Sequence, residues 1–82
     1  MTVYNWLLKQ LVIKGLPIQQ AREVLTLTNI SPECEDWNML VDEKDDEELL
    51  TGIYYDITPH CLAYINLNFP EDKQLQDKFL SK

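Results

Sequence analysis

The side chains best suited to covalent or metal chemistry are Cys34, His60 and Cys61, the only cysteines and the only histidine of the chain. A zinc site normally takes four ligands, often with one pair two to four residues apart, whereas His60 and Cys61 are adjacent. A cysteine nucleophile needs a base within reach and a third group that orients this base, and no such set is visible. We therefore expect no metal ion, no cofactor and no catalytic residue, with His60 in a turn and both thiols free.

Carboxylates are the other abundant reactive group, and they are unevenly distributed. Asp and Glu number 14 against 7 Lys and Arg, for a net charge of −7. Residues 33–56 hold ten acids and one lysine, whereas residues 1–32 carry a net +2 and residues 57–82 are balanced. Crowded acids on an exposed stretch repel one another and stay solvated, so they form no acid–base pair without a pocket. The run also lacks the central glycine and alternating ligands of a calcium loop.

Charge and hydropathy exclude several classes of protein. A nucleic-acid binder needs a basic face that displaces counterions from phosphate, and an anionic membrane would repel this chain. No apolar run approaches the roughly 20 residues that span a bilayer, and the first residues lack the basic start of a signal peptide. The 82 residues make one small domain, 1–82, with too thin a core for most enzyme pockets. We expect a cytoplasmic protein that is not an enzyme and contacts neither nucleic acid nor membrane directly.

Helical periodicity is clear in the first third of the chain. Thr2 suits the N-cap of a first helix that ends at Gly15, and Pro17 suits the first turn of a second helix. Together they predict a helical hairpin. A cap and proline at Ser31-Pro32 predict a third helix over residues 32–43, and the acids that follow suit the first turn of a short fourth helix that stops at Gly52.

After Gly52 the apolar period changes from helical to two. Residues 53–57 and 63–69 both alternate, and a connection at 59–61 would place their apolar side chains opposite one another, as in a β-hairpin. A lone hairpin is unstable in water, so the helices must cover it. Pro70 then opens a C-terminal helix. The expected fold is α+β, with the element order ααα(α)ββα.

Two surfaces remain as candidates for function, and the first we call the acidic face. It consists of Glu35, Asp36, Met39, Asp42, Glu43, Asp45, Asp46, Glu47 and Glu48. Duplex DNA carries about one charge per 1.7 Å of axis, so these eight carboxylates could imitate a short stretch of phosphates and occupy a basic groove. The plainer alternative is that the acids serve solubility and helix capping.

The second surface is apolar and comprises Trp6, Ile13, Tyr54 and Tyr64. Trp6 and Ile13 lie off the main apolar face of the first helix, and the two tyrosines point away from the core face of the expected hairpin. Aromatic residues are typical interface anchors, although a second packing neighbour could equally bury them. If they are exposed, they or the open hairpin edge would join two copies as a homodimer.

These observations predict a small acidic protein that acts by protein–protein binding. We expect an inhibitor or accessory factor that docks its acidic face on the basic, nucleic-acid-binding surface of a partner protein. The alternative is a structural subunit of a homo-oligomer, assembled through Trp6 and Ile13 or through the hairpin edge. In general character the chain resembles the small proteins of phages and mobile elements, and no motif ties it to a named family.

Overall fold

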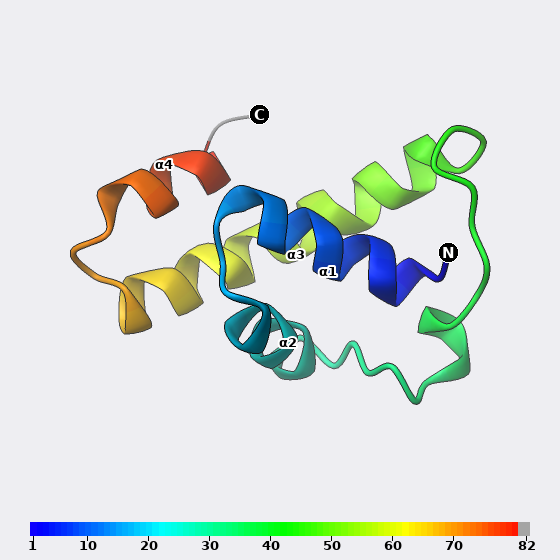
Figure 1. Cartoon of the computed structure of the whole chain (residues 1–82), viewed down its shortest axis with the longest axis horizontal. Helices are drawn as coiled ribbons and strands as arrows, with labels where there is room; N and C mark the ends of the chain where they lie inside the picture. Colours follow the sequence, from blue (N-terminus) through cyan, green and yellow to red (C-terminus); the bar gives the residue numbers. More distant parts are fainter. Residues whose placement is uncertain (81–82) are drawn as a thin grey trace.

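Four α-helices and one short 3₁₀ turn form the fold of residues 1–80, the part of the chain that this computed structural model describes. They are α1 (Val3–Lys14), α2 (Ile18–Leu27), η1 (Glu35–Trp37), α3 (Glu47–Asn68) and α4 (Lys73–Leu80). The long α3 crosses the whole molecule, with α1 packed against it and α4 folded back at its C-terminal end (Figure 1). The segment between α2 and α3 closes the opposite end, beside the N-terminus.

The helical hairpin formed by α1 and α2 is confirmed, and its ends are where the capping residues predict them. The Thr2 hydroxyl accepts a hydrogen bond from the backbone N–H of Asn5 at 3.1 Å. At the other end Gly15 has a φ of 118°, a left-handed conformation that glycine adopts without a steric penalty, and its N–H donates to the last carbonyls of α1. Pro17, with φ −58°, then directs the chain into α2.

One hydrophobic core joins all four helices. Leu7 from α1, Leu25 from α2 and Ile65 from α3 have 0% of their surface exposed, and Phe79 from α4 has 3%. No polar or charged residue within residues 1–80 is buried, so the core is held by apolar packing. No helix in this described range is both long enough and apolar enough to cross a membrane.

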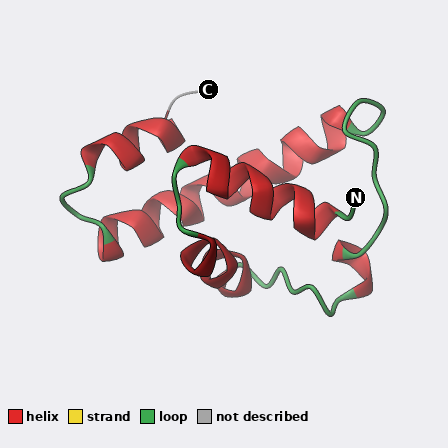
Figure 2. Ribbon diagram, in the orientation of Figure 1, coloured by secondary structure: helices red, strands yellow, loops and turns green. Residues whose placement is uncertain are grey.

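The predicted β-hairpin is wrong, and with it the α+β class and the order ααα(α)ββα. Residues 47–68 form the single helix α3, and none of residues 1–80 is drawn as a strand (Figure 2). The buried side chains of this helix are Leu50, Ile57, Cys61, Tyr64 and Ile65, which recur at intervals of three, four and seven. That spacing is one face of a helix. Apolar residues of the alternating pattern that lie off this helical face are exposed, such as Leu67 at 82%.

Two residues that favour a chain break lie inside α3 instead. Gly52 was expected to end a short helix and Pro59 to form a turn, since proline in a helix interior removes a hydrogen bond and costs about 3 kcal/mol. Both residues are exposed in the structure, so they interrupt no packing on the buried face of α3. The Thr58 hydroxyl also donates to the Tyr54 carbonyl at 2.8 Å, directly before the proline. His60, likewise expected in a turn, lies in this helix.

The predicted helix over residues 32–43 is also wrong. Only η1 is helical there, and residues 39–41 run extended beside the N-terminus. The Val3 N–H donates to the Met39 carbonyl at 3.1 Å, and the Val41 N–H donates to the Met1 carbonyl at 2.8 Å. The segment thereby gains backbone partners outside a helix, and Trp37 and Val41 reach the edge of the core. These tertiary contacts outweigh the local helical pattern.

Candidate functional site

The acidic face lies at one end of the molecule. All of its residues belong to the connection between α2 and α3 or to the first turn of α3, at the right of Figure 1. Every one of them is exposed except Asp46, which is half-buried. The surrounding residues 33–48, which we call the acidic segment, hold nine acids and one lysine, a net −8 that exceeds the −7 of the whole chain.

Three of these carboxylates have a structural role. The Asp42 side chain accepts hydrogen bonds from the backbone N–H groups of Asp45 at 3.1 Å and Lys44 at 2.8 Å, and these bonds lower its pKa. The Asp46 carboxylate accepts from the Asp42 N–H at 2.9 Å and closes the same turn. Glu43 pairs with Lys9 of α1, with 3.2 Å between Oε1 and Nζ.

The other acids have no such partner within the structure. The Lys9–Glu43 pair is the one ion pair among residues 1–80, so Glu35, Asp36 and Asp45 are exposed with no cation of these residues within 4.0 Å. Glu47 and Glu48 lie in the first turn of α3, where the helix dipole favours a negative charge. Capping therefore accounts for part of the acidic face and leaves the carboxylates of η1 unexplained.

Apolar side chains are displayed among these acids. Met39 is 50% exposed and its neighbour Leu40 is 77% exposed. Their backbone is fixed by the pairing with Met1 and Val3, so the two side chains are held outward at this end of the molecule. An exposed apolar pair within a strongly charged surface is an arrangement found in protein interfaces, where an apolar centre is surrounded by polar groups.

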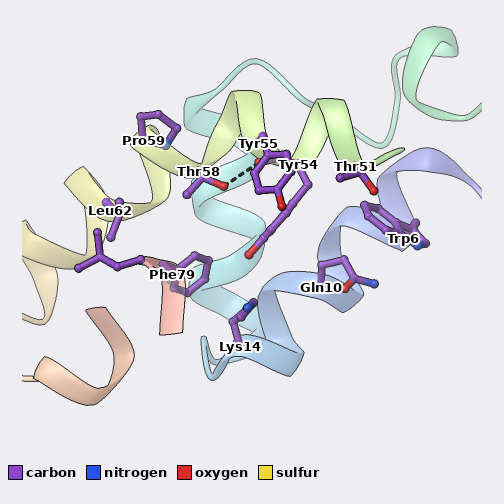
Figure 3. A pocket seen from close by; sticks show the side chains of 11 residues that line it. Trp6, Gln10, Lys14, Thr51, Tyr54, Tyr55, Thr58, Pro59, Leu62 and Phe79 are labelled. Carbon is purple, nitrogen blue, oxygen red and sulfur yellow. Dashed lines mark hydrogen bonds between the residues drawn. The ribbon is translucent and has the colours of Figure 1, made fainter. Parts of the chain in front are cut away.

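A second candidate site, which we call the aromatic groove, is a cavity of ≈ 420 Å³ between α1, α3 and α4. Its lining residues are Trp6, Gln10, Lys14, Thr51, Tyr54, Tyr55, Thr58, Pro59, Leu62, Phe79 and Leu80. Figure 3 shows Trp6, Gln10 and Lys14 on α1 facing the two tyrosines of α3, with Phe79 of α4 at the far end. Four aromatic rings therefore border one groove.

The residues of the predicted apolar surface are divided by the fold. Trp6 and Tyr54 meet in the aromatic groove, whereas Ile13 is 62% exposed on α1 and does not line it. Tyr64 is only 7% exposed, and its hydroxyl donates to Glu23 Oε2 at 3.0 Å. Burial and this hydrogen bond raise the pKa of Tyr64. The hairpin edge proposed as an oligomer contact does not exist, because the hairpin is a helix.

Of the groove residues, the sequence indicates only Trp6 and Tyr54 as candidates, and Tyr55, Phe79 and Lys14 are among those that sequence reasoning missed. As a strand residue Tyr55 would face the core, but in a helix it shares a face with Thr51, Thr58 and Leu62. That helical spacing was the available signal. Tyr54, on the same wall, has a raised pKa because it is partly buried and close to Cys61 and Tyr55. Its phenol is thus a neutral hydrogen-bonding group at physiological pH.

The residues first considered for chemistry lie apart. Cys34 is exposed near η1, whereas Cys61 is buried in the core and its pKa is raised to about 12 by this burial. A buried thiol with so high a pKa is protonated and unreactive at neutral pH. Within residues 1–80, no three His, Cys, Asp or Glu side chains are grouped so that they could hold a metal ion.

Comparisons of the chain with protein-family models, with curated proteins and with solved structures find no match. Function must therefore be inferred from the two surfaces themselves. The acidic face is defined by charge and the aromatic groove by shape. They also differ in position, because the groove lies between α1, α3 and α4 and shares no residue with the acidic face.

Proposed function

We propose that this protein acts by binding another protein, and that its acidic face docks on a basic surface of that partner. The observation that carries the proposal is the mixed surface at the α3 N-terminal end, where the exposed Met39 and Leu40 lie in a segment whose exposed carboxylates mostly make no ion pair within residues 1–80. A coat of acids for solubility needs no apolar side chains held outward by backbone pairing. A protein partner, in contrast, can bury both side chains and neutralise the charge around them.

The charge distribution favours a partner with a strongly basic surface. A field from about eight net negative charges accelerates encounter with a cationic surface and is screened by salt over roughly 8 Å at physiological ionic strength. Proteins that bind nucleic acid carry a strongly basic patch or groove of this kind. Inhibition or assistance of a nucleic-acid-binding protein is the function that best fits these properties.

The test compares two variants with equal change in net charge. The first, E35Q/D36N/D45N, neutralises three acids of the acidic face whose side chains make no ion pair within residues 1–80. The matched control, D56N/E71Q/D77N, neutralises three exposed acids elsewhere. A partner is first isolated from host lysate with the wild-type protein, and its association rate constant with each purified variant is then measured over a range of salt concentrations.

We expect the acidic-face variant to associate about tenfold more slowly than wild type at low salt, because steering by several charges contributes at least this much. The control variant should stay within about twofold, and high salt should remove the difference. Equal rates for both variants would show that only the net charge matters. A partner whose binding does not depend on salt would contradict docking by charge.

A further inference from the structure

The aromatic groove is not used by the proposed docking, and its dimensions are those of a small-molecule site. Ligand pockets in proteins enclose roughly 300–1,000 Å³, and this cavity encloses ≈ 420 Å³. Three helices form its walls, so the groove is made by tertiary packing rather than by one loop. The groove is partly open to solvent, so it is a surface site that a ligand can enter and not an internal void.

The walls define the apolar part of a ligand. The rings of Trp6, Tyr54 and Tyr55 approach the groove from α1 and α3, and Phe79 borders it from α4 (Figure 3). Tyr55 has 53% of its surface exposed. An aromatic ring with a free face gains from contact with another ring, so Tyr55 can contact a ligand. The Tyr54 and Tyr55 rings lie 6.0 Å apart with their planes tilted by 45°, so an aromatic group can stack on one of them and meet the other at an angle.

The charge of the lining defines the polar part of the ligand. Among the described residues 1–80 that line the groove, Lys14 is the only charged one and none is a carboxylate. This contrasts with the net −7 of the chain. Figure 3 shows the Lys14 side chain directed from α1 toward the tyrosines, and no carboxylate of residues 1–80 lies within 4.0 Å of its ammonium group. The cation is thus free to pair with an anionic group in the groove.

We propose that the aromatic groove binds a small aromatic molecule that carries one anionic group, with its rings in contact with Tyr54, Tyr55 and Trp6 and its anionic group paired with Lys14. The neutral phenol of Tyr54 and the amide of Gln10 provide further hydrogen bonds beside that ion pair. The site differs in place and in ligand chemistry from the acidic face.

Two fluorescent probes separate the contributions of charge and stacking. The first is 8-anilino-1-naphthalenesulfonate, which is aromatic and singly anionic. The second is N-phenyl-1-naphthylamine, which has the same rings without the sulfonate. Dissociation constants of both probes are measured by fluorescence titration for the wild type, for Lys14→Gln and Tyr55→Ala, and for the control Lys73→Gln, which removes a lysine outside the groove. Cooperative thermal unfolding of each variant verifies that it is folded.

We expect saturable binding of the anionic probe at one site. Lys14→Gln should weaken this binding about tenfold, since a hydrogen bond to a charged group contributes that much, and should leave binding of the neutral probe unchanged. Tyr55→Ala should weaken both probes, and Lys73→Gln neither. Equal loss of both probes in Lys14→Gln, or no loss of either, would overturn the assignment of Lys14 to the anion.

The two tryptophans give an independent test of location. Trp6 lines the aromatic groove and Trp37 does not, so titration with the anionic probe should shift the indole N–H resonance of Trp6 in ¹H–¹⁵N spectra and not that of Trp37. A shift confined to Trp37 would place the probe elsewhere and overturn the proposal. An unperturbed Trp6 in a protein that sediments as a dimer would show that a second copy occupies the groove, which also overturns it.

Discussion

The two glycines of the chain should respond to alanine with opposite signs. Gly52 lies exposed in the interior of α3, and a Cβ atom added there meets no other atom within 4 Å. Alanine is favoured over glycine in a helix interior by about 1 kcal/mol, so Gly52→Ala should raise the free energy of unfolding by about 0.5–1 kcal/mol. In a domain of this size that corresponds to an increase in Tm of about 2–8 °C.

Gly15 occupies a different backbone environment. Its φ of 118° lies in the region that residues with a Cβ atom rarely adopt, and a Cβ atom there would lie 3.2 Å from Leu75 Cδ1. Left-handed backbone costs an L-residue about 1–2 kcal/mol, so Gly15→Ala should lower the free energy of unfolding by at least about 1 kcal/mol. The contact with Leu75 adds to this loss unless α4 shifts.

The assay is urea and thermal unfolding followed by far-ultraviolet circular dichroism, with the wild type beside both variants. The slope of the unfolding free energy against urea concentration reports the surface that unfolding exposes. Equal slopes would show that the substitutions changed the stability and left this surface unchanged. A lower Tm for Gly52→Ala would refute the continuous helix α3 and favour a chain break at Gly52. A higher Tm for Gly15→Ala would refute the left-handed cap at the end of α1.

Further predictions concern the thiols and the ion pair. At about pH 8, iodoacetamide should alkylate the exposed Cys34 in the native protein, and Cys61 only after unfolding in urea. Mass spectrometry would detect the alkylated residues. Equal alkylation rates for both cysteines in the native protein would contradict the burial of Cys61. Because the pKa of Cys61 in the folded protein, about 12, exceeds the ordinary thiol value of 9.0, its contribution to stability is complete below about pH 9 and is lost as the pH rises toward 12. Unfolding free energies measured across this range should show a steeper alkaline decline in the wild type than in Cys61→Ala. Lys9→Gln should lower the free energy of unfolding by less than about 1 kcal/mol at low salt and not at high salt, because both partners of the Lys9–Glu43 pair are half exposed; a loss that persists at high salt would contradict this.

The parts of the fold that could be predicted are those with local signals. Thr2, Gly15 and Pro17 mark the limits of α1 and the start of α2 by backbone preferences that need no distant partner. The first turn of α3 follows from its acids in the same way, and Pro70 precedes α4. These features are encoded within a few residues, so they can be inferred without knowledge of the tertiary structure.

The β-hairpin failed because one stretch of sequence fits two periods. Ile53, Ile57 and Ile65 belong both to an alternating pattern and to a helical stripe, and short apolar runs do not distinguish the two. Leu50 and Cys61 distinguish the two patterns, because they extend the helical stripe and are fully buried in the core that α3 shares with the other helices. Pro59 added weight to the wrong interpretation, since its cost in a helix is real but is outweighed by packing over the length of α3.

The contrast between local signals and tertiary packing also explains which parts of the candidate sites could be predicted. The acidic segment is a run of neighbours, so its place on the surface followed from composition. The aromatic groove requires α1, α3 and α4 to meet, and Lys14 and Phe79 are 65 positions apart in the sequence. With Tyr55 placed on a strand, no local pattern could bring it beside Trp6.

The N-terminal residues and the acidic segment share backbone hydrogen bonds, and this affects how the molecule opens. The backbone hydrogen bonds Val3–Met39 and Val41–Met1 flank the Thr2–Leu40 bridge. Neither of the two paired segments can therefore separate without breaking the bonds of the other. Fraying of the first turn of α1 and release of the middle of the acidic segment are therefore one local unfolding event. The amide hydrogens of Val3 and Val41 should show a common protection factor against exchange with solvent deuterium, and the opening free energy that it reports sets the fraction of molecules in which Met39 and Leu40 keep the arrangement that a partner would recognise.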